Sequence, residues 1–179
     1  MKETVKGRAF VFGHNLDTDQ IYPGRYLELT DAEDVGQHAM EGVDPEFVQK
    51  FKAGDIIVAG RNFGCGSSRE QAPYALKVRQ VGAILAESFA RIFYRNAINL
   101  GLPVLICPDI SQQVTDGDVL TVDFASGGGL NERTGRKFQA EPLSEYAIKI
   151  IESGGIAHLV KKKYGASRKD LMGRGVKVQ

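Results

Sequence analysis

The 179-residue sequence contains only two cysteines, Cys65 and Cys107. Two isolated thiols exclude a disulfide framework and a cysteine metal cluster within this chain. The three histidines are scattered and form no metal-ligand spacing. No apolar run approaches the roughly 18 residues that a membrane helix needs, and residues 1–6 lack the apolar core of a signal peptide. We therefore expect a cytoplasmic protein that binds no metal by itself and has no contact with a membrane.

Excess charge is also scarce, because the whole chain carries a net charge of only +1. Residues 161–179 are the exception: seven basic residues and one acidic residue give them +6, which leaves −5 for residues 1–160. A basic tail can indicate nucleic-acid binding, but this one has a single aromatic residue, Tyr164, and no nucleic-acid-binding module is present. We expect one domain over residues 1–160 and a basic extension over 161–179 that contacts solvent or a partner.

The most informative stretch present is the glycine- and serine-rich run at residues 60–73. An apolar run precedes it and helical spacing follows it, so it connects a buried strand to a helix. Ser67 with Glu70, and Ser68 with Gln71, each fit the capping-box pattern for the start of that helix. The pattern alone fits two interpretations: a well-capped tight turn, or an anion-binding loop in which backbone N–H groups and Arg69 attract negative charge.

Strands and helices alternate through the middle of the chain. Apolar runs predict strands, and helical spacing predicts helices between them, over 5–12, 55–59, 70–80, 82–86, 89–100 and 102–107. This alternation indicates a parallel α/β core. Short strands at 119–124 and 136–140, separated by a glycine turn at 127–129, indicate an antiparallel addition, and a helix to about residue 152 follows.

Start signals predict where several of these helices begin. Ser88 is a candidate N-cap for the helix that ends at Gly101. Thr30 with Glu33 fits a capping box and predicts a short helix to about Met40.

Two polar groups near the N-terminus are further candidates. Asp17 and Asp19 lie in a turn-prone setting, and their spacing alone favours an Asx-turn. Arg25 is the only basic residue of types Lys or Arg between positions 9 and 49. Its guanidinium could clamp a substrate carboxylate through two hydrogen bonds, or could be an ordinary surface group.

The stretch from Asn62 to Glu70 resembles the signature of the swivelling domain of the aconitase superfamily. Residues 15–21, 26–27 and 88–93 resemble further motifs of that superfamily, in the same order. Within it, the chain is similar to the separate small subunits of 3-isopropylmalate dehydratases and their relatives, over most of residues 5–160.

The resemblance implies a three-layer β/β/α fold with a parallel core sheet and a smaller antiparallel sheet. It implies that Ser67 removes a proton from the substrate carbon, although a free serine is a very weak base that needs stabilisation as an alkoxide. Asp19 would orient this serine and a substrate-binding arginine. Ser68 and Arg69 would bind a substrate carboxylate, and Arg25 is a weaker candidate for the same role.

The resemblance also implies that residues 26–29 read the variable side chain of the substrate. Relatives that act on an extra carboxylate carry an arginine in the third place, and those that act on an isopropyl group carry an apolar residue. This chain departs from both with Glu28. A carboxylate there disfavours homoaconitate or aconitate by repulsion. Leu27 and Leu29 could line an apolar pocket, with Glu28 in solvent or paired with Arg25.

These observations support two functions of different classes. The first is the small subunit of a hydro-lyase for a branched hydroxy-dicarboxylic acid, with 3-isopropylmalate preferred and 2,3-dimethylmalate, methylmalate or homoaconitate as alternatives. The resemblance then implies a large-subunit partner, in a heterodimer or heterotetramer, that holds a four-iron iron–sulfur cluster. The second is a small anion-binding module that uses the same loop.

Overall fold

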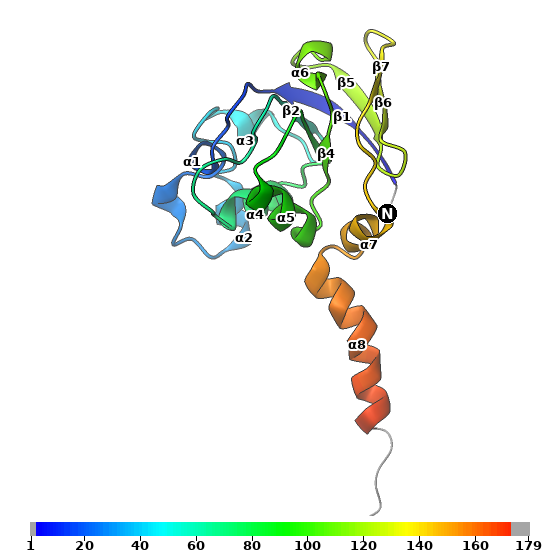
Figure 1. Cartoon of the computed structure of the whole chain (residues 1–179). Coiled ribbons are helices and arrows are strands. Elements are labelled where there is room, and N and C mark those ends of the chain that lie inside the picture. Colours follow the sequence, from blue (N-terminus) through cyan, green and yellow to red (C-terminus); the bar gives the residue numbers. More distant parts are fainter. Residues whose placement is uncertain (1–2, 173–179) are drawn as a thin grey trace, which may run out of the picture.

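The structure, a computed structural model, describes the backbone of residues 3–172 and the side chains of residues 3–165. Its centre is a seven-stranded sheet with the strand order β4-β3-β2-β1-β5-β6-β7 (Figure 1). The strands are β1 (Thr4–Val11), β2 (Ile56–Ala59), β3 (Ala83–Ala86), β4 (Val104–Ile106), β5 (Val119–Asp123), β6 (Gly128–Asn131) and β7 (Lys137–Gln139). Strands β1 to β4 pair in parallel, and β1, β5, β6 and β7 pair antiparallel.

Strand β1 joins the two parts of the sheet by using its two halves differently. Residues 9–11 pair in parallel with β2. Residues 4–8 pair antiparallel with β5. The predicted α/β class, with a parallel core and an antiparallel addition, is therefore confirmed.

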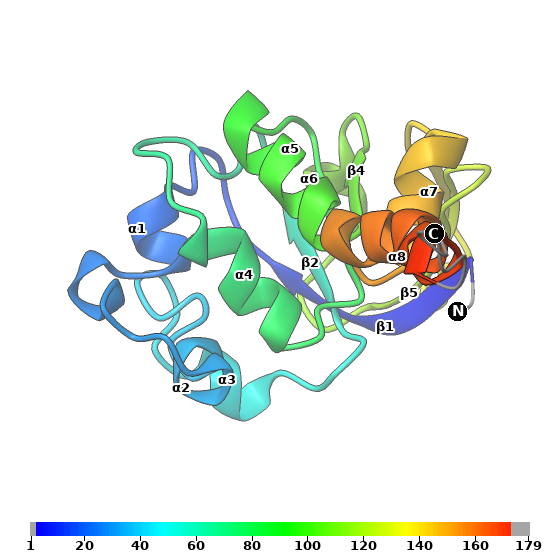
Figure 2. The ribbon, with the colours of Figure 1, turned by 90° about the horizontal axis from the view of Figure 1, so that it is seen from below.

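Two helices on one face of the sheet make the parallel crossovers. Helix α4 (Gln71–Val78) connects β2 to β3, and α5 (Arg91–Leu100) connects β3 to β4. Figure 2 shows α4 and α5 next to each other in front of the parallel strands. All residues of β2 and β3 are buried, as expected for parallel strands covered by helices. Gly101 ends α5 in a left-handed conformation with φ 78°, which confirms the predicted C-cap.

Short helices fill the long connection between β1 and β2. They are α1 (Thr18–Ile21), the 3-10 helix η1 (Gly24–Tyr26), α2 (Ala32–Gly36) and α3 (Phe47–Lys50). After β4 come α6 (Ile110–Gln113), α7 (Glu145–Glu152) and α8 (Ile156–Met172). Helix α7 has the N-cap Ser144, whose hydroxyl accepts a hydrogen bond from the Ala147 N–H at 3.1 Å.

The predicted caps of α4 and α5 are wrong. The N-cap of α4 is Glu70, without a side-chain hydrogen bond, so Ser67 and Ser68 remain in the preceding turn. The N-cap of α5 is Ala90, and the Ser88 hydroxyl instead accepts a hydrogen bond from the Asn62 N–H at 2.8 Å. At α5 a contact with a distant segment thus takes the place of the local cap, whereas at α4 no side chain caps the helix.

The helix predicted from Thr30 to Met40 is also wrong in its bounds. Its N-cap is Asp31, because that carboxylate reaches the N–H groups of both Glu33 and Asp34. The helix, α2, ends at Gly36, and turns follow it.

The glycine turn predicted at residues 127–129 is shorter than expected. Only Gly127 has a positive φ, 74°, while Gly128 and Gly129 belong to strand β6. Gly129 pairs with Phe138 on β7, and a Cβ on Gly129 would lie 2.0 Å from the Phe138 ring. Glycine is present at this position because the aromatic ring leaves no room for a side chain. The sequence analysis took these glycines for a turn and therefore did not predict strand β6.

Helix α8 crosses the boundary predicted at residue 160. It begins beside α7 and then extends away from the sheet (Figure 1). The division into a domain at 1–160 and an extension at 161–179 stays a prediction. Within the described part of the chain, no helix combines the length and the apolar character that crossing a bilayer requires.

Candidate active site

The glycine-rich turn after β2, residues 62–70, is called the signature turn here. Two left-handed glycines give it its shape. Gly64 has φ 81° and Gly66 has φ 89°, values that side chains disfavour. A Cβ on Gly64 would lie 2.3 Å from the ring of Phe93 on α5. The backbone thus lies directly against α5, which leaves room only for glycine at this position.

Hydrogen bonds join this turn to the segment that follows β1. The Gly64 N–H donates to the Leu16 carbonyl at 2.7 Å, and the Thr18 N–H donates to the Cys65 carbonyl at 2.9 Å. The buried Thr18 hydroxyl donates to the Ser67 carbonyl at 2.7 Å. These bonds fix the backbone of the two serines relative to the start of α1.

The two aspartates of this segment have different structural roles. Asp17 is the N-cap of α1 and forms a complete capping box with Gln20. Asp19 accepts a hydrogen bond from Arg69 Nη1 at 2.6 Å and another from the Gly24 N–H at 2.8 Å. The spacing favoured an Asx-turn; Asp17 instead caps a helix, whereas Asp19 contacts the turn that contains Arg69.

Arg69 is held on the side of α1. Its Nη1 also donates to the Tyr22 carbonyl at 3.3 Å. The hydrogen bond from Arg69, followed by that from Gly24, lowers the pKa of Asp19, so this carboxylate is ionised at neutral pH. The charge of Arg69 is thus offset by a neighbour within the same chain.

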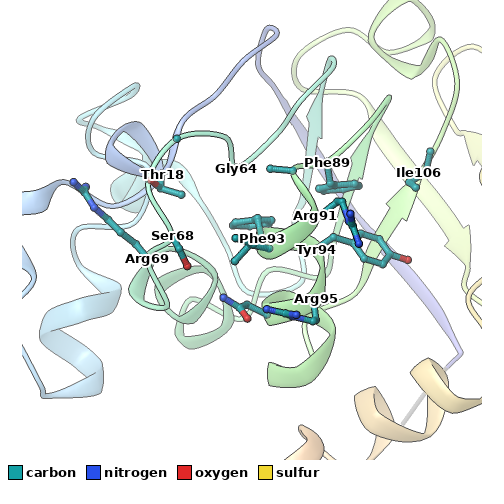
Figure 3. Close-up of a pocket in the computed structure, with 14 residues that line it drawn as sticks. Thr18, Gly64, Ser68, Arg69, Phe89, Arg91, Phe93, Tyr94, Arg95 and Ile106 are labelled. Atoms are coloured by element: carbon teal, nitrogen blue, oxygen red, sulfur yellow. The ribbon is translucent and has the colours of Figure 1, made fainter.

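A cavity of about 740 Å³ lies between the signature turn and α5. Three arginines line it, and no lining residue is acidic; the lining consists of Thr18, Gly64, Gly66, Ser68, Arg69, Phe89, Ala90, Arg91, Ile92, Phe93, Tyr94, Arg95, Asn96 and Ile106. In Figure 3 Ser68 and Phe93 face each other across the cavity, and the Arg69 side chain extends away from Phe93, toward α1. The cavity combines a positive field with an apolar wall.

The structure brings some of the predicted site residues to this cavity and leaves others outside it. Ser68 and Arg69 line it. Ser67, in the same turn, and Asp19, on α1, do not line it but are each hydrogen-bonded to a residue that does. Residues 25–29 do not line it.

Sequence reasoning missed Arg91, Arg95 and Asn96 as residues of the cavity wall. The signal was present, because Arg91 and Arg95 are four residues apart on a helix and share one face.

The predicted substrate-reading loop lies in and after η1. Arg25 Nη2 pairs with Glu41 Oε1 at 2.7 Å. Within the described side chains, no ion pair or hydrogen bond joins Glu28 to Arg25, and Glu28 is exposed. Of the two neighbouring leucines, Leu27 is 37% exposed and Leu29 packs partly against the core.

The described residues do not provide the ligands of an iron–sulfur cluster. Cys65 is half-buried, and Cys107 is buried. Burial, with a smaller effect of Asp109, raises the pKa of the Cys107 thiol to about 12, which disfavours the thiolate that binds iron. No group of three or more His, Cys, Asp or Glu side chains in the described ranges could hold a metal ion.

Comparison with known proteins gives consistent relatives. The aconitase C-terminal domain family matches residues 14–108. The chain is 50% identical over 163 residues to the 3-isopropylmalate dehydratase small subunit 1 of Methanopyrus kandleri, covering 91% of this chain and 96% of that one. It is 51% identical over 158 residues to the methanogen homoaconitase small subunit of Methanothermobacter thermautotrophicus, covering 88% and 91%.

A solved structure is similar along nearly its whole length. The 3-isopropylmalate dehydratase crystal structure from Methanocaldococcus jannaschii has a TM-score of 0.87 and 42% identity, and the match covers 93% of this chain and 99% of that chain. From the same organism, the isopropylmalate/citramalate isomerase small subunit is 49% identical over 168 residues, 94% of this chain and 100% of its own.

Proposed function

Because the chain belongs to the aconitase C-terminal domain family, we propose that it is the small subunit of a two-subunit hydro-lyase that interconverts 2-isopropylmalate and 3-isopropylmalate. This step would belong to leucine biosynthesis in the cytoplasm. The names of relatives about 50% identical over most of the chain support the proposal. The observation that carries it is the cavity beside Ser68, whose lining includes three arginines and no acid. Such a lining suits a dicarboxylate.

We propose that Ser67 removes the proton from the substrate carbon. Thr18 holds its backbone through the carbonyl, and within the described residues the Ser67 hydroxyl has no side-chain partner. The hydroxyl is therefore free to face a substrate. The arginine-rich cavity wall would favour the alkoxide, because positive charge stabilises the ionised form of a neighbouring acid.

Ser68 and Arg69 would bind a substrate carboxylate from the cavity edge. Asp19 uses only the Nη1 edge of Arg69, so the remaining N–H groups of the guanidinium can donate to a ligand. Asp19 would thus orient Arg69 as a positioning residue. The alternative of an independent anion-binding module has less support, because relatives that match most of this chain are named as small subunits of a dehydratase.

The partner would be a large subunit that holds a four-iron cluster, and the cluster would act as a Lewis acid on the substrate hydroxyl when bound. This chain's own residues do not fit the cluster, since the described part offers no cysteine ligand set. In this proposal the chain supplies the base and carboxylate-binding groups.

The preferred substrate would carry an isopropyl group. Glu28 is exposed and would repel an additional carboxylate. A methylmalate, 2,3-dimethylmalate or homoaconitate is the alternative, and the names of a citramalate isomerase and a homoaconitase among the relatives favour keeping them in the substrate panel. One methylene changes selectivity by only about 1 to 3 kcal/mol, so cross-activity is expected.

The test is reconstitution with an iron–sulfur large subunit. We expect turnover of 2-isopropylmalate by the complex and none by either subunit alone. The panel adds citramalate, 2,3-dimethylmalate and homoaconitate under identical conditions. Turnover by this chain alone, free of metal, would contradict the proposed division of roles, and a preference for homoaconitate would contradict the proposed substrate.

A further inference from the structure

Glu41 is a contact point for three side chains around the predicted substrate-reading loop. Its Oε1 accepts hydrogen bonds from Arg25 Nη2 and from the Tyr26 hydroxyl, each at 2.7 Å. Its Oε2 contacts His38 Nδ1 at 2.5 Å. The Glu41 side chain is 21% exposed, so these contacts are partly shielded from water.

Ring stacking makes this cluster rigid. The rings of Tyr26 and His38 are parallel, with centroids 3.5 Å apart and an interplanar angle of 12°. The Arg25 guanidinium also packs against the Tyr26 ring, with its central carbon 4.8 Å from the ring centroid. Arg25 is thus held by an ion pair and a cation–π contact together.

The loop is also attached to the signature turn at its other end. The Tyr22 hydroxyl donates to the Tyr26 carbonyl at 2.7 Å. The Gly24 N–H donates to Asp19, which in turn pairs with Arg69. Contacts therefore run without a break from Arg69 through residues 22–26 to Glu41.

This arrangement decides which groups the loop can offer to a ligand. Arg25 is the only arginine or lysine between positions 9 and 49, and its charge is offset by Glu41. The Tyr26 hydroxyl is also occupied. Among the described side chains, no ion pair or side-chain hydrogen bond involves residues 27–29. Leu27 and Leu29 suit an alkyl substituent, and Glu28 is an exposed carboxylate, so these three residues offer a ligand no cation.

We propose that Glu41 is a specificity-determining positioning residue: by holding Arg25 and Tyr26 it withholds a cation from the loop and so disfavours substrates with a third carboxylate. The inference rests on the proposed function. It differs from the expectation that Glu28 neutralises Arg25, because the pairing acid is Glu41.

The decisive variant is Glu41→Gln, which keeps the shape and one acceptor but removes the charge. In the reconstituted complex we expect kcat/KM for homoaconitate relative to 2-isopropylmalate to rise by about threefold to tenfold, the range for one partly exposed charge pair. The rise should appear mainly as a lower KM for homoaconitate. The double variant Glu41→Gln/Arg25→Gln should return the ratio to the parent value.

Two further variants serve as controls. Glu33→Gln makes the same charge change on α2, at an exposed side chain with no ion pair in the described structure, and should leave the ratio unchanged. Glu41→Asp retains the charge but is shorter by one methylene, so it should give a smaller rise of the same sign. Thermal unfolding verifies the fold of each, and Glu41→Asp provides the test if Glu41→Gln does not fold.

A binding measurement separates this inference from the proposed function. The chain alone is titrated with propane-1,2,3-tricarboxylate while the Arg25 side-chain N–H resonance is followed by NMR. We expect Glu41→Gln to bind about threefold to tenfold more tightly than the parent. An unchanged affinity and an unchanged substrate ratio in folded Glu41→Gln would overturn the role of Glu41. Absence of turnover in the parent complex would instead refute the proposed function, and the titration would still decide on Glu41.

Discussion

At the scale of single residues, the Asp19–Arg69 pair combines two parts of the chain that are 50 residues apart. The Arg69 side chain is 21% exposed and the Asp19 side chain 65% exposed. A pair open to solvent on one side contributes little to stability. Its significance is orientation, since it fixes one edge of a guanidinium and leaves the other edge for a ligand.

The serine pair gives the sharpest prediction at this scale. Removing a general base typically lowers the rate by about two to four powers of ten. Ser67→Ala in the reconstituted complex should therefore lower kcat by at least that factor, while thermal unfolding and subunit pairing remain those of the parent. Ser68→Ala is the matched control, because Ser68 lines the cavity and should act mainly on KM.

A reversed result would exchange the two roles. If Ser68→Ala abolished kcat while Ser67→Ala changed it by less than about threefold, Ser68 would be the base.

At the scale of elements, the turn between β2 and α4 depends on the absence of a side chain at Gly64. Gly64→Ala combines a positive φ with a methyl group in contact with Phe93. We expect a loss of about 2 to 4 kcal/mol in the free energy of unfolding, measured by urea denaturation. Gly13→Ala is the control, because a Cβ there has open space and φ is not positive; it should change stability by less than about 0.5 kcal/mol. Equal losses in both variants would contradict this account.

A buried acid directly before strand β5, Asp118, makes stability depend on pH. Asp118 accepts hydrogen bonds from Arg133, from the Thr115 N–H at 2.9 Å and from Asn131 Nδ2 at 2.7 Å. These contacts, that of Arg133 foremost, outweigh burial and lower the pKa of Asp118 from 3.8 to about 2. The folded pKa is below the unfolded one, so the contribution is complete above pH 3.8 and is lost as pH falls through about 2.

Urea midpoints measured between pH 5 and pH 2 test this contribution. The parent should lose stability progressively below about pH 4, whereas Asp118→Asn should be less stable at neutral pH and should lose less over the acid range. Asp34→Asn, at an exposed carboxylate of α2, should follow the parent curve. Parallel curves for the parent and Asp118→Asn would show that Asp118 is not the titrating group.

At the scale of the whole molecule, the charge is divided between a body at −5 and a C-terminal segment at +6. Helix α8 begins against the body through Ile156 and Leu159, which pack on the core. From residue 161 to residue 165 its side chains are exposed. This supports the proposal that residues 161–179 are an extension and are dispensable for folding.

Truncation tests that proposal. A chain that ends at residue 160 should unfold within about 1 kcal/mol of the parent, because the removed side chains up to residue 165 are exposed. A chain that ends at residue 155 also loses Ile156 and Leu159 and should be destabilised by about 1 to 3 kcal/mol. Calorimetry or urea denaturation measures both. A large loss in the longer chain would contradict the domain boundary.

The sequence by itself determined the features that short stretches encode. The apolar runs predicted buried strands at β2 and β3, and Gly101 predicted the end of α5. Residues 60–73 predicted the turn that holds the two serines. These predictions succeed because burial periodicity and left-handed backbone conformations depend mainly on a few neighbouring residues.

Only the tertiary structure decided the contacts between distant residues. It paired Asp19 with Arg69 and Glu41 with Arg25. It also placed the Ser88 hydroxyl where it accepts a hydrogen bond from the Asn62 N–H and does not cap a helix. It also brought Arg91 and Arg95 to the cavity wall. The physical reason is that local and distant partners compete for the same polar group. A side chain that can cap its own helix can equally form a hydrogen bond or an ion pair with another segment. The packing of the segments that follow β1 and β2 decides which partner is within reach.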